Sequence, residues 1–293
     1  MQETKELNAL FTLIDDPDEV VYTTVTEKLV GYGNPVIPNL EHLWETTPNE
    51  VIQERIEMII HRLHFTDLQN DLTEWNSSAC PDLLFGALLI AKFQYPDLLA
   101  APVVHDIEKI RRNVWLELNS FLTPLEQANV LSSIIYNYYH LKGIELKYEI
   151  PDEFFIHKVL ESKKGNAVAN SIIYQILCEK LEVNARIIGI PKQSIIAFFN
   201  SEFELGEPDT LYRDQILFFV DATNGQAYSH NDIETYLKRM GLSIDPDYFI
   251  PLSHPQIIKQ LIHQVAKCFC KNEELYKKEE LMQLASILAE TKK

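Results

Sequence analysis

Residues 165–174 read GNAVANSIIY and residues 185–199 read ARIIGIPKQSIIAFF, and these two stretches decide the fold class. The first has a glycine followed by apolar residues at helical spacing, which predicts a helix over about 166–181. The second contains two runs rich in Ile and Phe, 185–190 and 194–199, which are typical of buried strands. A similar run at 215–221 precedes Asn224-Gly225, a pair that favours a tight hairpin turn. The pattern predicts a helix followed by a small antiparallel sheet.

The residues before this region are helical throughout. Apolar periodicity predicts helices at about 7–14, 20–29, 36–44, 49–63, 83–94, 103–120 and 124–141. The first four are separated by Asp-Pro, Gly-Pro and Thr-Pro turns, and this order resembles a short HEAT-type solenoid. An irregular bundle fits nearly as well, because two helical hairpins are too few to establish a repeat.

The chain after the sheet also reads as helical. Residues 201–214, SEFELGEPDTLYRD, predict a loop between two strands, and a helix over 229–241 follows with Ser229 or Asn231 as its cap. The tail, with Leu281, Leu284 and Leu288, predicts a helical hairpin packed on the body. The fold class is therefore α+β. We divide the chain into helical hairpins (1–78), a core with leading helices (79–250) and a C-terminal helical hairpin (251–293).

Composition describes an acidic globular protein. The 293 residues are 46% hydrophobic and carry a net charge of −17, and such a surface repels phosphate backbones. We therefore expect no nucleic-acid partner. The one short basic group is Lys109, Arg111 and Arg112, beside Trp115, and we interpret it as a solvated helix face or a structural ion pair.

The first residues, MQETKELNALFTLIDD, are acidic where a secretory signal needs a basic start and an apolar run. No stretch approaches the ~18 uninterrupted apolar residues of a membrane span. These observations favour a cytoplasmic protein without membrane partners.

No cofactor or metal motif stands out. Cys268 and Cys270 are too close for the usual metal knuckle and have no second pair. His61 and His64 lie on one helix without an evident third ligand, so we favour surface or packing roles for them. Glycine-rich phosphate loops are absent from the sequence. We expect no cofactor, no metal and no disulfide framework.

The order of glycine, helix, ARIIGIP, strand and VDATNG resembles the transglutaminase-like superfamily, and more closely its bacterial SirB-like branch, in which helices precede the core. The segments that carry the resemblance are 82–98, 106–119, 159–177, 187–199 and 220–229. The resemblance implies a papain-like core. It also implies a cysteine at a helix start, a histidine on a following strand and an aspartate on the next, all in one pocket.

The resemblance places these three roles on particular residues of this chain. The cysteine position, two residues after the helix-starting glycine, is Ala167. The histidine position, just after the Gly-Ile-Pro turn, is Gln193, and the aspartate position is Asp221. A thiolate at a helix start and an imidazole that accepts its proton are the required chemistry. Only the orienting acid is retained, so we predict no catalytic residue at these vestigial positions.

Other residues do not replace the missing groups. Cys178 lies eleven positions beyond Ala167, about 16 Å along a helix. We interpret Asp221 as a residue that holds the strand end or the following turn by accepting backbone hydrogen bonds. On the same alignment, Gln193 is expected to donate a hydrogen bond to Asp221 in place of histidine.

We therefore expect a non-catalytic, transglutaminase-like pseudoenzyme that binds a protein or peptide through its groove or its N-terminal helices. The alternative is a cysteine-type hydrolase or acyltransferase whose nucleophile is not recognised. A third possibility is a structural subunit of a larger assembly.

Overall fold

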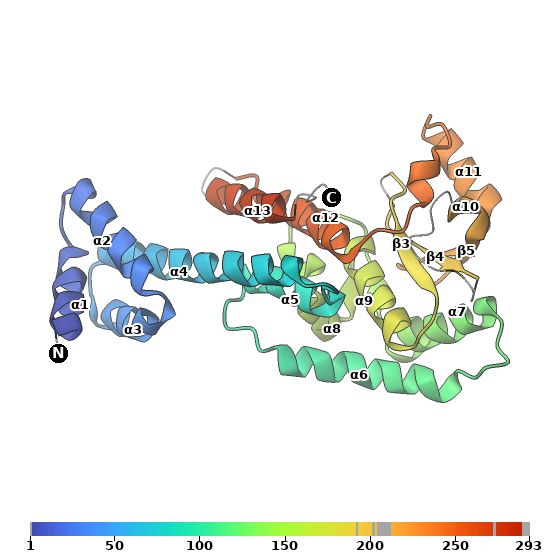
Figure 1. Cartoon of the computed structure of the whole chain (residues 1–293), viewed down its shortest axis with the longest axis horizontal. Coiled ribbons are helices and arrows are strands. Elements are labelled where there is room, and N and C mark those ends of the chain that lie inside the picture. Colours follow the sequence, from blue (N-terminus) through green and yellow to red (C-terminus); the bar gives the residue numbers. More distant parts are fainter. Residues whose placement is uncertain (1, 192, 201–202, 204–211, 272–273, 289–293) are drawn as a thin grey trace. The chain divides into compact units, whose positions relative to one another are not determined.

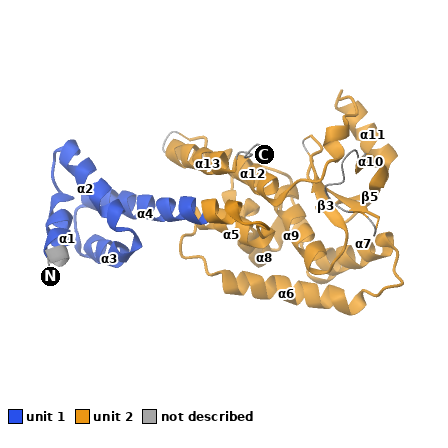
Figure 2. Ribbon diagram, in the orientation of Figure 1, with its two compact units in different colours: residues 1–71 blue, residues 72–293 orange. Residues whose placement is uncertain are grey.

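The computed structural model describes residues 2–191, 193–200, 203, 212–271 and 274–288. The chain forms two compact units, Met1–Asp71 and Leu72–Lys293 (Figure 2). Most of the loop predicted at 201–214 lies outside the described residues. Within it, Tyr212–Gln215 form the short helix α10.

The first unit is helical, as the sequence predicts. It contains α1 (Gln2–Leu13), α2 (Glu19–Tyr32), the 3₁₀ turn η1 (Asn34–Val36), α3 (Ile37–Thr46) and the first part of α4 (Glu50–Ser77). Arg55 of α4 donates hydrogen bonds to the carbonyl oxygens of Ile14 and Asp16, at 3.1 and 2.7 Å. These bonds satisfy carbonyls just beyond α1, and the same guanidinium forms an ion pair with Glu19.

Helix α4 is longer than the sequence reading allowed. The predicted end near residue 63 is wrong, because the helix continues to Ser77. Leu68, Leu72 and Trp75 are all buried and recur at helical spacing. Their spacing continues the apolar face of the helix beyond the predicted end.

The second unit is built around helix α9 (Ala167–Lys180), which is buried at every position from Ala169 to Cys178 (Figure 1). Contacts with α9 come from other helices and from strands β3 and β4. Those helices are α5 (Leu83–Lys92), α6 (Ala100–Glu117), α8 (Ile156–Ser162) and α12 (His254–Ala266). Such an environment explains why most of the α9 sequence, AVANSIIYQIL, is apolar, with Asn170, Ser171 and Gln175 as its buried polar side chains.

The remaining helical elements surround this centre. They are α7 (Pro124–Ser132), the π-helical turn η2 (Ser133–Tyr138), the 3₁₀ turns η3 (Pro151–Phe154) and η4 (Pro246–Phe249), α11 (His230–Arg239) and α13 (Leu275–Ile287). Ser229 caps α11 in a reciprocal capping box with Asp232, which confirms one of the two predicted caps. Helices α12 and α13 pack together as the predicted C-terminal hairpin.

The predicted antiparallel sheet is present. It has the strand order β3 (Ala185–Ile188), β4 (Ile195–Phe199), β5 (Ile216–Asp221), β6 (Ala227–Tyr228). The α+β class is thereby confirmed. A parallel pair of two-residue strands, β1 (Lys142–Gly143) and β2 (Lys164–Gly165), was not predicted, because two residues carry no readable alternation.

The outer edge of β3 is covered by the chain that leads into α12. Leu252 N–H donates to the carbonyl oxygen of Ile187 at 2.9 Å, and Ile188 bridges to Pro251. On the same strand, Ile187 N–H donates to Oε1 of Gln175 in α9, at 2.7 Å. These bonds use main-chain groups that an edge strand would otherwise leave unpaired.

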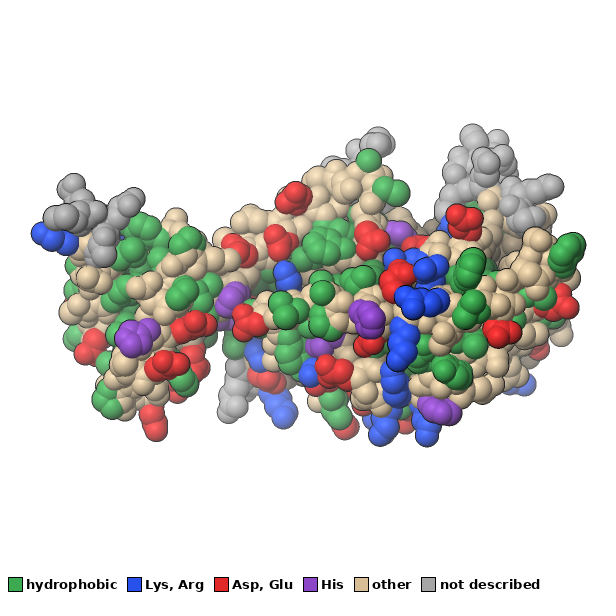
Figure 3. Space-filling view, turned by 90° about the horizontal axis from the view of Figure 1, so that it is seen from below, with side chains coloured by type: hydrophobic (Ala, Val, Ile, Leu, Met, Phe, Trp, Pro, Cys, Tyr) green, Lys and Arg blue, Asp and Glu red, His purple; other side chains and the backbone are tan. Residues whose placement is uncertain are grey.

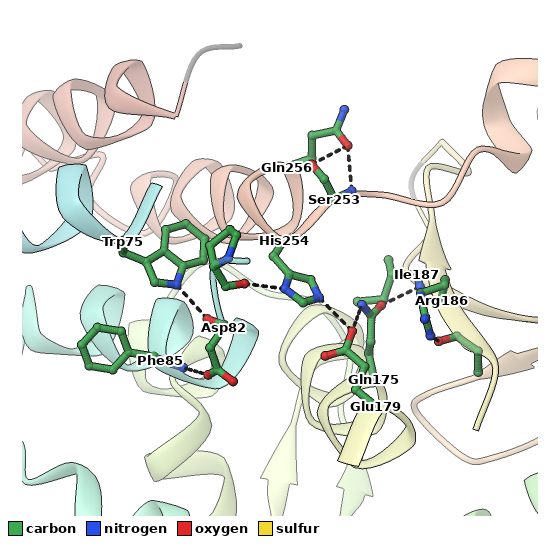
Figure 4. A network of polar contacts seen from close by, with 12 residues as sticks. Trp75, Asp82, Phe85, Gln175, Glu179, Arg186, Ile187, Ser253, His254 and Gln256 are labelled. Carbon is green, nitrogen blue, oxygen red and sulfur yellow. Dashed lines mark hydrogen bonds and ion pairs between the residues drawn. The ribbon is translucent and has the colours of Figure 1, made fainter. Parts of the chain in front are cut away.

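A polar network links α12 to α9 and to Pro81, which lies just before the cap of α5 (Figure 4). His254 Nε2 lies 2.8 Å from Oε1 of Glu179, and its Nδ1 lies 2.6 Å from the carbonyl oxygen of Pro81. Both partners only accept hydrogen bonds, so both ring nitrogens carry protons and His254 is an imidazolium. Gln175 donates a further hydrogen bond to Glu179 at 2.7 Å.

In this network, the pKa values of His254 and Glu179 shift in the directions opposite to those that burial alone would cause. Burial lowers the pKa of His254, but the hydrogen bond and charge of Glu179 outweigh it and raise the pKa above 6.5. Burial raises the pKa of Glu179, but the hydrogen bond and charge of His254 lower it below 4.5. The His254 contribution to stability is therefore full below pH 6.5 and is lost as pH rises through the raised pKa. The Glu179 contribution is full above pH 4.5 and is lost as pH falls.

We predict that His254→Gln lowers the free energy of unfolding by about 1–3 kcal/mol at about pH 6, the usual cost of losing a charged, largely buried hydrogen bond. The loss shrinks at a second, alkaline pH above the raised pKa of His254, where the wild-type imidazolium has lost its proton. Urea titration at both pH values measures the difference. His105→Gln, an exposed position, is the control. An equal loss for His254→Gln at both pH values would contradict the charged state assigned to His254.

Candidate functional site

Helix α9 begins at the position where the family resemblance places a nucleophile. Asn166 caps the helix, and its Oδ1 accepts hydrogen bonds from the N–H groups of Val168 and Ala169 at 3.0 and 3.1 Å. Ala167, the first helical residue, is half-buried. The capping oxygen uses the donors that would otherwise favour an anionic group at this terminus. The helix start therefore offers the methyl group of Ala167 and a capping oxygen that is already in use, while the buried Nδ2 of Asn166 has no hydrogen-bond partner within the described residues.

Gln193 and Asp221, the other two family positions, lie together. Both line a cavity of about 310 Å³ between the sheet and α11. The complete lining is Ile190, Gln193, Ile195, Asp221, Tyr228, Asp232, Ile233, Thr235, Tyr236 and Arg239. Asp221 pairs in register with Ile195, which brings the end of β5 beside the start of β4.

Residues 194 and 195, where β4 begins, face opposite sides of the sheet. Ser194 Oγ lies 2.5 Å from Ser171 Oγ of α9, so Ser194 faces α9. Ile195 instead packs with Ile233 and Leu237 of α11, as alternation along a strand requires. Gln193 and Asp221 line the cavity on the α11 side, and Ala167 does not line it. That all three positions share one pocket stays a prediction.

Asp221 holds the turn that follows β5, in agreement with the structural role suggested by the sequence. Its Oδ1 accepts hydrogen bonds from both the N–H and the O–H of Thr223, each at 2.7 Å. Its carbonyl oxygen accepts from Gly225 N–H at 2.8 Å, and Gly225 has the positive φ of 75° that favours glycine. This turn links β5 to β6.

The predicted hydrogen bond from Gln193 to Asp221 is not formed. Among the described residues, the donors to the Asp221 carboxylate come from Thr223. Gln193 is exposed, and its main-chain N–H donates to the carbonyl oxygen of Ile190 at 3.1 Å. Gln193 therefore does not reproduce the contact that a family histidine would make with this acid.

The same turn is fastened to the rest of the core. Gly143 N–H donates to the carbonyl oxygen of Thr223 at 3.0 Å, and Tyr136 O–H donates to that of Ala222 at 2.6 Å. A Cβ atom on Gly143 would lie 2.4 Å from that Thr223 oxygen, so only glycine permits this approach. Burial, followed by the charge of Asp221, raises the pKa of Tyr136 far above its usual value, which keeps its hydroxyl a donor.

The cavity has apolar, aromatic and charged sides. Burial, together with the charges of Asp221 and Asp232, raises the pKa of Tyr228, so two carboxylates act on this hydroxyl. Tyr236 donates its O–H to the carbonyl oxygen of Pro191 at 3.1 Å. Arg239 is exposed at the far end of α11 and forms no ion pair among the described residues.

Sequence reasoning missed the contribution of α11 to this cavity. Asp232, Tyr236 and Arg239 lie at positions i, i+4 and i+7, which is one face of a helix. That spacing was readable in the sequence. The position of this helix beside the cavity was not readable, because it depends on how the segment after β6 folds back over the sheet.

The thiols occupy two kinds of environment. Cys178 is completely buried in α9, and this burial raises its pKa far above the ordinary value. Burial also raises the pKa of Cys268, to about 12. Cys80 and Cys270 are exposed. No group of three or more His, Cys, Asp or Glu side chains suited to a metal ion occurs within the described ranges.

We predict that Asp221→Ala lowers the free energy of unfolding by about 1–3 kcal/mol, because Thr223 loses the acceptor of two hydrogen bonds. Asp221→Asn retains an acceptor oxygen and costs less than half as much. Chemical denaturation of both variants measures the difference. Equal losses for the two variants would show that the charge of Asp221, rather than its oxygen, matters at this turn.

Comparison with known proteins agrees with this architecture. A family model described as transglutaminase-like superfamily matches residues 101–263, more than half of the chain. A search of curated proteins and a search of solved structures each found no match. The matched region runs from α6 to α12 and includes α9, the sheet and the cavity beside α11. The chain belongs to the transglutaminase-like superfamily.

Proposed function

We propose that this protein is a non-catalytic member of the superfamily, of the SirB-like type, which binds a protein or peptide in the cytoplasm. The observation that carries the proposal is the chemistry of the family positions. Helix α9 begins with Ala167, and no thiol or imidazole is among the residues that line the cavity of Gln193 and Asp221. A cysteine mechanism requires both groups in contact.

The cavity supports the binding half of the proposal. Its volume of about 310 Å³ is at the lower end of the range for ligand pockets, and suits one or two side chains of a peptide. Ile190, Ile195 and Ile233 supply apolar surface, Tyr228 and Tyr236 supply aromatic surface, and polar groups at the ends can orient a bound chain. This combination of an apolar lining with few polar groups is typical of recognition sites.

Site-specific photo-crosslinking tests the binding proposal. A photoreactive amino acid at Thr235, which lines the cavity, is expected to capture a protein or peptide from native cytoplasm. The same amino acid at Asn231 is the matched control, because Asn231 lies one turn earlier on α11 and is exposed outside the cavity. Equal capture at both positions, or none at Thr235, would refute the cavity as the binding site.

The cysteine-enzyme alternative makes a different demand, namely a thiol that is accessible and ionised near neutral pH. Cys178 and Cys268 have raised pKa values, which is the opposite of what a nucleophile requires.

We predict that iodoacetamide at about pH 6 leaves Cys178 unmodified in the native protein, because the thiol is buried and protonated. Peptide mass spectrometry measures the modified fraction of each cysteine over time. The exposed Cys80 and Cys270 report that the reagent is active, and denaturation in urea should make Cys178 reactive. Alkylation of native Cys178 or Cys268 faster than that of the exposed Cys80 and Cys270 would instead support the enzyme.

A further inference from the structure

Four large apolar side chains are exposed within eleven residues of the second unit. Trp115 and Leu116 end α6 with 61% and 67% of their surface exposed, Phe121 in the following loop is 93% exposed, and Leu125 in the first turn of α7 is 46% exposed. We call these residues, together with Arg112, the α6–α7 surface. Monomeric proteins rarely expose large contiguous apolar patches, and those that do use them for interaction.

Helix geometry gathers these side chains on the outer side of α6. The inner side of the helix buries Val103, Ile107, Ile110 and Val114 in the core. Arg112, Trp115 and Leu116 have the spacing i, i+3 and i+4, so they are neighbours on the exposed side. Aromatic residues and arginine are also the residues that most often dominate the binding energy of interfaces.

Basic side chains of α6 lie beside the exposed apolar residues. Lys and Arg side chains form a stripe on this face of the molecule, with hydrophobic side chains on both sides of it (Figure 3). Arg111 and Lys180 both pair with Glu108, at 2.6 and 2.9 Å. Within the described part of the chain, Lys109 and Arg112 form no ion pair. Two cations beside the exposed apolar residues are therefore available to a partner.

A depression beside Phe121 offers space for an anchoring side chain. Ser120, Leu122 and Pro124 line one side of a cavity of about 590 Å³. Leu122 and Pro124 give this side an apolar character next to the exposed residues of the loop. Interface anchors typically enter such pockets, while the surrounding contacts exclude water.

We propose that the α6–α7 surface is the docking site for an acidic amphipathic helix of a protein partner. The ridge of helically spaced anchors fits the apolar side of a second helix, and Lys109 and Arg112 select acidic residues along its margin. A second copy of this chain is disfavoured because two molecules of net charge −17 repel one another.

A pair of synthetic peptides tests the proposal on the full-length protein. Each peptide has about 20 residues, roughly 30 Å as a helix, with leucines at heptad positions and either glutamate or lysine at the remaining positions. Fluorescence anisotropy of the labelled peptides measures the dissociation constants. The glutamate peptide is expected to bind at least about tenfold more tightly, and increasing salt should reduce the difference.

Variants of the protein test whether the glutamate peptide binds at the α6–α7 surface. Phe121→Asp and Arg112→Glu are each expected to weaken binding of the glutamate peptide about tenfold, a typical effect of losing an interface anchor. Leu99→Asp is the matched control, because Leu99 is 73% exposed at the other end of α6, about 25 Å from Leu116. It should leave binding unchanged. All three positions are exposed, and thermal unfolding checks that each variant remains folded.

Three results would overturn the proposal. The first is equal binding of the glutamate and lysine peptides, or an equal loss for Leu99→Asp and Phe121→Asp. The second is a dimer in analytical ultracentrifugation that Phe121→Asp dissociates, which would assign the surface to a second copy of the chain. The third is co-sedimentation of the wild type, but not of Phe121→Asp, with phosphatidylglycerol vesicles, which would assign it to a membrane.

Discussion

The burial of helix α9 is the constraint on which the second unit depends. Ten consecutive residues of this helix are buried, and the Asn170 amide among them has no hydrogen-bond partner within the described residues. Polar side chains at these positions can bond only to partners inside the protein. Gln175 meets this requirement by accepting from the main chain of β3 and donating to Glu179. Glu179 in turn holds His254. The polar side chains Gln175 and Glu179 thus link α9 to the sheet on one side and to the C-terminal hairpin on the other.

The same burial determines where a ligand can reach the protein. The sheet covers one side of α9 and carries the accessible cavity on its other side, beside α11. Of the family positions, Ala167 begins the covered helix, and Gln193 and Asp221 line the cavity. None of the helices in the described part of the chain combines the length and apolar composition of a membrane span.

Much of the architecture was readable in the sequence, because strong local signals specify it. The glycine before α9, the Ile- and Phe-rich strands and the Ser229 cap all act within a few residues. The end of α4 was missed because polar residues there outnumber the buried ones. The site was predicted less well. Asp221 was correctly identified as the residue that holds the turn, but whether Gln193 faces α9 or α11 depends on where the pleat of β4 begins, which no local pattern reports.

The segment that pairs with the edge of β3 also constrains how the chain can associate and be shortened. Because Pro251 and Leu252 use the main-chain groups of that edge, a ligand cannot bind there by adding an extended strand. A truncation before these residues would uncover the edge and also remove α12 and α13. The uncovered edge of the fragment would then be open to pairing with strands of other molecules. We therefore expect such a fragment to aggregate rather than simply to unfold.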